Sequence, residues 1–255
     1  MPEIDDGARS MEEAVEMARI AAEDGIEYMV STPHMFNGLS ANPEPSEILE
    51  RVAALNEAIN NPKGLKILPG NEVHVSHDIA DHARNNRVMK INQQNYMLVE
   101  FPQLTVPIGA DELFYKLLIQ GVRPILVHPE RNGQLQANPS TVGKFVDCGV
   151  YIQVTAMSVT GEFGPAAKAT ADTLLRHNCV HFLATDTHRP EKRPPVLSRG
   201  RDAAAAIIGA DAARLLVEDN PLAVVKGEAI VPPAVIPYEK PPGSARSFFG
   251  RIFLR

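Results

Sequence analysis

The stretch Ile125-Leu126-Val127-His128-Pro129-Glu130-Arg131 decides the fold that we expect for this chain. Three apolar residues lead directly into a histidine, and the proline that follows interrupts the strand. A continuous apolar run of this kind is typical of a strand that is buried on both faces, as in a parallel sheet. His128 would then lie at the carboxyl end of a strand, where α/β folds place their functional groups.

Further apolar runs lead into a possible metal ligand in the same manner. They begin near residues 28, 66, 96 and 181, and the ligands that follow are His34, Glu72, Glu100 and Asp186, with His188 two residues later. Strands that alternate with helices predict a mainly parallel sheet. We therefore predict an α/β fold with a closed or distorted barrel, because a closed barrel brings every carboxyl strand end to one central pocket.

Helical periodicity fills the segments between these strands and predicts a helix in each. The first begins after Ser10, with Glu13 completing a predicted capping box. A short helix and a loop are expected within residues 76–95, which are polar. The other predicted helices cover about residues 46–60, 110–120, 138–149, 165–177, 198–208 and 211–218.

Length and composition exclude several classes of protein. With 255 residues, 44% of them hydrophobic, the chain can form one large α/β domain. The net charge of −6 and the lack of tryptophan do not suggest a nucleic-acid-binding protein. We expect neither a membrane span nor a signal peptide, and hence a cytoplasmic protein. Cys148 and Cys179 are expected to be buried free thiols.

The two ends of the chain differ from the rest. Residues 1–7 resemble a strand-to-helix loop without the strand that should precede it. From Val231 onward the chain is rich in proline and then basic and aromatic. We therefore predict a domain of residues 1–230 and a tail of residues 231–255 outside the core. The tail would be disordered, docked on the barrel, or in weak contact with an anionic membrane.

The predicted pocket contains an unusual number of metal-ligating groups. They are Asp6, His34, Glu72, Glu100, His128, Asp186 and His188. Imidazole and carboxylate ligands together suit zinc, manganese or iron. Seven groups exceed what one ion needs, so the set indicates two or more metals, an arrangement that can clamp a phosphoryl group. Arg131 and Arg193 follow two of these ligands and are candidates for bidentate contacts to phosphate.

A structural role is the main alternative for each of these residues. A single histidine or aspartate at a strand end is more often a buried hydrogen-bond partner than a ligand, but recurrence at five strand ends favours the functional interpretation. The remaining polar residues are assigned to surface loops (His74, His77, Arg189, Lys192), to structural positions (His82, His177, His181) or to a helix face (Arg199, Arg201).

Seven short motifs occur in order along the chain. They are Ile-Asp-Asp-Gly-Ala (4–8), Thr-Pro-His (32–34), Leu-Pro-Gly-Asn-Glu-Val (68–73), Val-Glu-Phe-Pro (99–102), His-Pro-Glu-Arg-Asn (128–132), Gln-Val-Thr-Ala (153–156) and Asp-Thr-His (186–188). As a set they resemble the polymerase-and-histidinol-phosphatase (PHP) superfamily. Within it, they resemble the bacterial capsule and exopolysaccharide tyrosine-protein phosphatases, over roughly residues 4 to 220.

This resemblance implies a distorted (β/α)7 barrel with two to three metal ions, most often manganese, with iron or zinc as alternatives. It implies metal-dependent hydrolysis of phosphotyrosine in the tail of a membrane-bound tyrosine autokinase that controls polysaccharide export, hence a place near the inner membrane. A homo-oligomer is left open. The seven ligand candidates match the family's metal ligands, and Arg131 and Arg193 match its phosphate-binding arginines.

One feature departs from the family's pattern. The family opens with a strand that carries His-x-His just before the Asp-Asp-Gly loop, and this sequence starts after that point. We therefore expect a barrel without its first strand, and fewer bound ions than in a version extended upstream. Two alternatives remain, a small-molecule phosphoesterase resembling histidinol phosphatase and an N-terminally truncated, inactive relative that only binds its partner.

Overall fold

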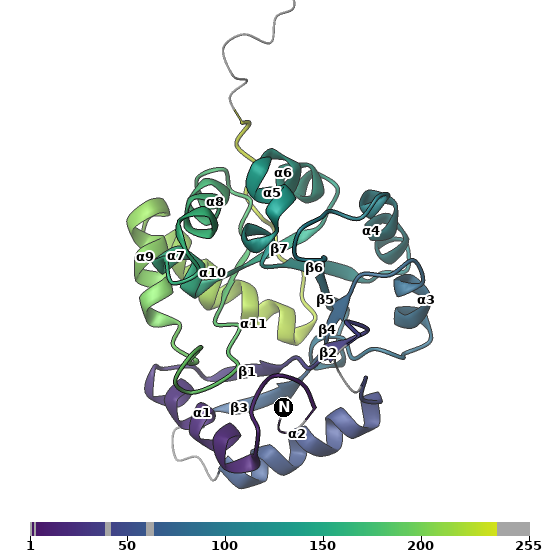
Figure 1. Cartoon of the computed structure of the whole chain (residues 1–255), viewed down its shortest axis with the longest axis vertical. Helices are drawn as coiled ribbons and strands as arrows, with labels where there is room; N and C mark the ends of the chain where they lie inside the picture. The colour runs from purple at the N-terminus through teal and green to yellow at the C-terminus, as the bar shows by residue number, and fades with distance from the viewer. Residues whose placement is uncertain (1, 3, 39–41, 60–63, 239–255) are drawn as a thin grey trace, which may run out of the picture.

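Strands and helices alternate along the chain in the computed structural model, which describes residues 2, 4–38, 42–59 and 64–238. All the paired strands run parallel to one another within the described residues. Figure 1 shows the strands in the middle of the molecule with helices around them. The predicted α/β class with a parallel sheet is confirmed, and Asp186 and His188 follow the last strand as expected.

The strands form two sheets in the described part of the chain. One pairs β1 with β3, and the other has the order β2-β4-β5-β6-β7-β8. Their bounds are β1 (Tyr28–Ser31), β2 (His34–Met35), β3 (Lys66–Pro69), β4 (Glu72–His74), β5 (Tyr96–Glu100), β6 (Arg123–Val127), β7 (Tyr151–Thr155) and β8 (Phe182–Ala184).

The break between the two sheets positions the first ligands. The segment of β1 and β2 is interrupted at Pro33, and the neighbouring segment of β3 and β4 is interrupted at the same level, at Asn71. Pairing then resumes with His34 of β2 opposite Glu72 of β4. The Asn71 side chain fills the break, because its amide donates to the Pro33 carbonyl at 3.0 Å and is itself buried. Gly70 is needed here, since a Cβ would lie 2.8 Å from the Val30 side chain. His34 and Glu72 therefore begin new strand segments instead of following a strand end.

The helices agree with the predicted ones to within a few residues, but α5, α7 and α11 are not predicted from the sequence. Among the described residues the helices are α1 (Met11–Glu23), α2 (Pro45–Ile59), α3 (Ile79–Arg84), α4 (Ala110–Leu118), α5 (Gly133–Ala137), α6 (Ser140–Asp147), α7 (Ala156–Thr160), α8 (Pro165–Arg176), α9 (Ser198–Ile208), α10 (Ala210–Val217) and α11 (Asp219–Lys226). Single 3-10 turns cover Ile91–Gln93 and Pro129–Arg131.

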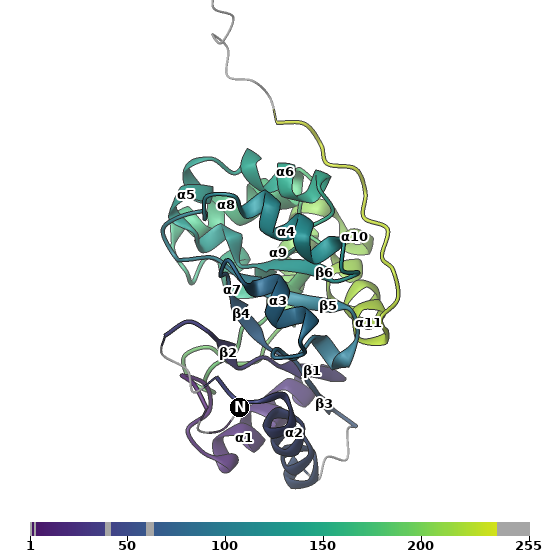
Figure 2. The same cartoon turned by 90° about the vertical axis from the view of Figure 1, so that its right-hand side faces the viewer.

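Two apolar clusters stabilise opposite ends of the molecule. The larger one lies between β4–β8 and the helices outside them, and a second one joins α1, α2 and β3, which Figure 2 shows together at one end. Only half of the predicted capping box forms at the start of α1. Ser10 Oγ accepts from the Glu13 amide, whereas the Glu13 carboxylate accepts from the Arg9 amide and not from that of Ser10.

The edges of β1 and β8 do not pair with each other in the described part of the chain. A cavity of about 710 Å³ lies along both strands and reaches from Met17 of α1 to Leu98 and Ile125 on the inner side of the sheet. Consistent with an unpaired edge, the apolar strand β1 is only partly buried, and Tyr28 is 47% exposed. Barrel closure therefore remains a prediction.

The two cysteines differ from the prediction in one respect. Both are free thiols and Cys179 is buried, as expected, but Cys148 is exposed. It follows the last residue of α6, whose buried face is formed by Val142, Gly143 and Phe145, so the prediction of a buried Cys148 is wrong.

The first part of the predicted tail packs on the domain. The Ile236 amide donates to the His177 carbonyl at 3.0 Å, and the Tyr238 ring stacks on that of His177 with centroids 3.8 Å apart. The basic and aromatic part lies outside the described residues, so its membrane contact remains a prediction. Within the described part of the chain, no helix has the length and apolar character that a membrane span requires.

Acid should destabilise the fold through His181. This ring is buried, its Nδ1 accepts from the Ile152 amide at 2.9 Å, and burial lowers its pKa to about 4. The unfolded chain would take up a proton near pH 6.5 and the folded chain only near pH 4, so the free energy of unfolding should fall as pH falls between these values. The loss should reach about 3 kcal/mol.

Urea denaturation of the wild type and of His181→Asn between pH 4 and 7 measures this effect. The asparagine oxygen can still accept from Ile152 but does not titrate, so the variant should lack this part of the pH dependence. Identical slopes in the two proteins would contradict the assignment.

Candidate metal centre

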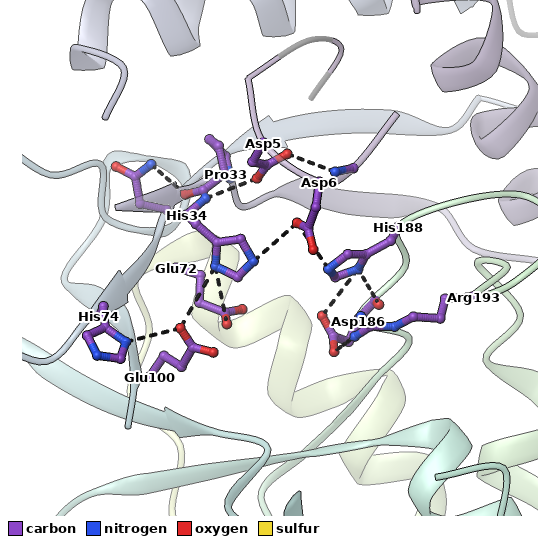
Figure 3. A network of polar contacts seen from close by, with 12 residues as sticks. Asp5, Asp6, Pro33, His34, Glu72, His74, Glu100, Asp186, His188 and Arg193 are labelled. Atoms are coloured by element: carbon purple, nitrogen blue, oxygen red, sulfur yellow. Dashed lines mark hydrogen bonds and ion pairs between the residues drawn. The ribbon is translucent and has the colours of Figure 1, made fainter. Parts of the chain in front are cut away.

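The first group of ligands joins the N-terminal turn to the loop after β8. Asp6 Oδ1 lies 3.6 Å from His34 Nε2 and 3.5 Å from His188 Nε2 (Figure 3). Asp5 fixes this turn, because its carboxylate accepts from the amides of Gly7 and His34, both at 3.1 Å. The predicted strand-to-helix loop therefore brings Asp6 to the site, although most of the Asp6 side chain is exposed.

The second group lies across neighbouring parallel strands. His34 Nδ1 is 3.7 Å from Glu72 and 4.0 Å from Glu100, and His128 Nε2 is 3.0 Å from the same oxygen of Glu72. The strand register explains this arrangement, since His34 pairs with Glu72 across β2 and β4, and β5 follows in the sheet. Glu72 is buried and Glu100 is partly buried, so the group lies inside the molecule.

Two sets of three ligand atoms are close enough to hold an ion each. They are Asp6, His34 and His188, and His34, Glu72 and Glu100, with the atoms of each set within 4.8 Å of one another. His34 belongs to both sets, and it directs Nε2 toward Asp6 and Nδ1 toward the two glutamates. Its Nδ1 is buried without a hydrogen-bond partner, as expected for a nitrogen that is left free for a metal.

Asp186 lies outside both sets and contacts the two arginines. Arg131 Nη1 donates to Asp186 Oδ2 at 2.5 Å, and Arg193 Nη2 donates to the same oxygen. Asp186 and His128 both have backbone in the left-handed region, with φ of 49° and 36°, which residues with a side chain rarely adopt. Such conformations are frequent at functional sites, where the surrounding structure holds them.

Neighbouring opposite charges shift the pKa values of Asp6 and His188. A hydrogen bond to His188 lowers the pKa of Asp6 to about 2, and the positive charges of His188 and His34 act in the same direction. Burial opposes charge on His188, but Asp6 and Asp186 outweigh it and raise the His188 pKa. The carboxylates and the His188 imidazole on this side of the site therefore stabilise each other's charged forms.

On the buried side of the site, neighbouring opposite charges also outweigh the effect of burial on the pKa values. Burial works against a charged His128, yet the contact with Glu72 raises its pKa. Burial also opposes ionisation of Glu100, but His74, His128 and His34 together lower its pKa.

His74 is a member of the site that the sequence analysis misplaces. It is the last residue of β4, it is half-buried, and its Nδ1 lies 3.4 Å from Glu100 Oε2. The prediction of a surface loop is wrong because the strand continues past Glu72. Alternation along a strand was the available signal, since Glu72 and His74, two residues apart, point to the same face. His77, in contrast, is exposed as predicted.

Glu130 also contributes to the site, and the sequence analysis assigns it no role. It is fully buried, and its carboxylate accepts from the Thr155 amide at 3.0 Å and from Ser158 Oγ at 2.6 Å. These bonds tie the loop that carries His128 and Arg131 to β7 and α7. Burial raises the pKa of Glu130, as expected for a carboxyl group with a structural role.

A parallel α/β fold that gathers imidazoles, carboxylates and two arginines at one end of its strands is typical of metal-dependent phosphoesterases. The chain belongs to the family described as "Capsular polysaccharide synthesis, CpsB/CapC", whose sequence model matches residues 1–226. The resemblance to the capsule and exopolysaccharide phosphatases is thereby confirmed at the level of the family.

Two relatives illustrate the similarity of this chain to other members of the family. The tyrosine-protein phosphatase YwqE of Bacillus subtilis is 36% identical over 194 residues, which are 76% of each chain. The putative tyrosine-protein phosphatase CapC of Staphylococcus aureus is 32% identical over 202 residues, or 77% of each chain.

A solved structure is also similar, with a TM-score of 0.88 and 31% identity over 94% of this chain and 96% of the other. It belongs to a study of YwqE from Bacillus subtilis and CpsB from Streptococcus pneumoniae, described as metal-dependent tyrosine phosphatases.

Proposed function

We propose that this chain is a metal-dependent protein-tyrosine phosphatase of capsule or exopolysaccharide synthesis. The observation that carries the proposal is that His34 belongs to both ligand sets and that His188 of one set lies beside Asp186, which holds two arginines. The names of the relatives as tyrosine-protein phosphatases support it, and they weigh against a histidinol phosphate substrate.

The residues present fit a metal centre of two or more ions. Both sets combine imidazole and carboxylate donors, and the unpartnered His34 Nδ1 lies near two glutamates. This combination of donors suits manganese first, with iron or zinc as alternatives. Asp6 and His188 would hold one ion, and Glu72, Glu100 and His128 another; His34 would bind one of the two, since a neutral imidazole has one free ring nitrogen. When bound, the ions would supply positive charge that stabilises the phosphoryl oxygens.

The protein's own arginines would bind and orient the phosphate. Arg131 and Arg193 each carry several N–H donors, of which Asp186 occupies only part. A phosphate at this place would receive charge-assisted hydrogen bonds from the remaining donors. Asp186 would fix both guanidinium groups in position before the substrate arrives, which lowers the entropic cost of orienting them.

The proposed substrate is a phosphotyrosine in the tail of a bacterial tyrosine autokinase, encountered in the cytoplasm near the inner membrane. The role of the family in capsular polysaccharide synthesis supports this choice. We further propose a PHP-type (β/α)7 barrel whose opening strand, with His-x-His, would lie in the cavity between β1 and β8. The lack of pairing between β1 and β8, which both line this cavity, supports that placement.

Phosphate release from a phosphotyrosine peptide tests the function directly. The purified protein, loaded with Mn²⁺, should release phosphate from this peptide faster than from a phosphoserine peptide or from histidinol phosphate. Removal of the metal by a chelator should abolish the reaction, and added Mn²⁺ should restore it. Preference for histidinol phosphate would instead identify a small-molecule phosphoesterase.

The same assay distinguishes an enzyme from an inactive relative. The assay is repeated with a second form of the protein, which has an N-terminal extension that carries the His-x-His strand. The metal content of the original and the extended form is measured as well. Release by either form supports the phosphatase, and the extended form should hold more ions per chain. No release by either form, with metal bound, would contradict the proposed function.

A further inference from the structure

Phe163 lies in a tight loop between α7 and α8, beside the two arginines. Gly161 and Gly164 flank the loop with φ of 98° and 90°, a backbone region that favours glycine. The Gly164 amide donates to the Gly161 carbonyl at 3.0 Å, and the Phe163 amide donates to the Met157 carbonyl at 3.4 Å. The loop therefore presents the Phe163 ring from a backbone that is held at both ends.

Both guanidinium groups lie close to this one ring. The Cζ atom of Arg131 is 4.7 Å from the centre of the Phe163 ring, and that of Arg193 is 5.3 Å away. Both distances fall within the range of cation–π attraction. The two arginines thus share a phenyl ring as well as the carboxylate of Asp186.

Packing of the fold does not account for this side chain. Phe163 is partly exposed, and it belongs to none of the buried apolar clusters formed by the described residues. The α7–α8 loop also lies next to α9 at its surface, where Arg199 of α9 pairs with Glu162. An aromatic ring with two cationic neighbours and little packing role indicates a function at the site.

We propose that Phe163 is a positioning residue, which holds Arg131 and Arg193 in the orientation that receives the phosphate. This inference rests on the proposed phosphatase function. Asp186 alone fixes one end of each guanidinium group, which leaves rotation about that contact open. The ring restricts this rotation through its face, because a flat guanidinium group stacks on an aromatic surface. The remaining N–H donors then point together to one place.

The test replaces the ring by side chains that separate stacking from volume. Phe163→Leu keeps an apolar side chain of similar size but removes the aromatic face, and Phe163→Tyr keeps that face. Binding of inorganic phosphate to the Mn²⁺-loaded protein is measured by calorimetry, together with kcat and KM for the phosphotyrosine peptide. The control is Tyr115→Leu on the outer surface of α4, where the side chain is 63% exposed.

Phe163→Leu should weaken phosphate binding and lower kcat/KM about tenfold, since a small misplacement of binding groups is costly in rate. Phe163→Tyr should stay near the wild-type values, and so should Tyr115→Leu. Metal content should be equal in all four proteins. Unchanged phosphate binding in Phe163→Leu, or a loss in Phe163→Tyr as large as in the leucine variant, would overturn the positioning role.

These outcomes are distinct from failure of the proposed function itself. If the wild type releases phosphate from the peptide and the leucine variant equals it, only the role of Phe163 is wrong. If the protein binds phosphate but neither it nor the N-terminally extended form releases phosphate from the peptide, the phosphatase assignment fails. The calorimetric comparison still decides whether Phe163 orients the arginines.

Discussion

Arg131→Ala should lower kcat/KM for a phosphotyrosine peptide by about a hundredfold or more, while the melting temperature stays within a few degrees of the wild type. The rate should fall because charge-assisted hydrogen bonds to the phosphoryl group are lost in the transition state. The fold should persist because Asp186, the partner of Arg131, keeps its contact with Arg193. Steady-state kinetics and thermal unfolding measure the two effects.

Two further variants show whether the effect belongs to this position. Arg131→Lys keeps the charge but loses the planar set of donors, so it should recover only part of the rate. Arg214→Ala removes an exposed arginine that pairs with Glu218 and Asp219 on the surface, and it should change nothing. The comparison uses the form of the protein that releases phosphate. An unchanged rate in Arg131→Ala, or loss of the fold, would refute the role of Arg131.

The sequence predicts the part of the fold that depends on local patterns. Apolar runs that stop at a ligand, such as Ile125–Val127 before His128, correctly indicate buried parallel strands, because burial on both faces leaves a continuous apolar segment. Helical periodicity places α2, α4, α8 and α9 to within a few residues, because a helix that is buried on one face repeats its apolar residues about every 3.6 positions.

Features that depend on contacts between distant residues are not predicted. The interruption of two strands at Pro33 and Asn71 rests on a hydrogen bond between residues 38 positions apart, and it moves His34 and Glu72 into new strand segments. His74 lies in a strand for the same reason, because the new segment β4 begins at Glu72 and ends at His74. Short helices such as α5 and α7, with five residues each, have too few turns for periodicity to appear.

The candidate site is predicted as a set of residues but not as a network. Carboxyl strand ends gather in a parallel fold, so the sequence suffices to bring Glu100 and His128 together with His34 and Glu72, which lie just past β1 and β3. It does not show that His34 belongs to two ligand sets or that Asp186 joins two arginines. The first depends on the turn that places Asp6, and the second on the left-handed backbone of Asp186. The approach of both arginines to the Phe163 ring likewise depends on a loop, the one between Gly161 and Gly164.

His34→Gln should have the largest effect of any single substitution in the metal centre. His34 is the residue that both ligand sets contain, so its loss removes a ligand whichever ion its free nitrogen binds. We expect metal content to fall, and the rate of phosphate release to fall about a thousandfold, since metal charge stabilises the transition state by several kcal/mol. Elemental analysis and the peptide assay measure the two losses.

The controls separate the metal centre from the fold and from histidines in general. His77→Gln makes the same chemical change at an exposed position and should leave metal content and rate unaltered. His74→Gln removes a ring that contacts Glu100 but belongs to neither ligand set, so its effect should lie between the other two.

Because Glu72 retains its contact with His128 when the His34 ring is absent, the fold of His34→Gln should persist without metal. Metal content equal to the wild type would mean that the two sets do not depend on His34. The centre would then have to be built from Glu72, Glu100 and His128 on one side and Asp6 and His188 on the other, without a contribution from His34.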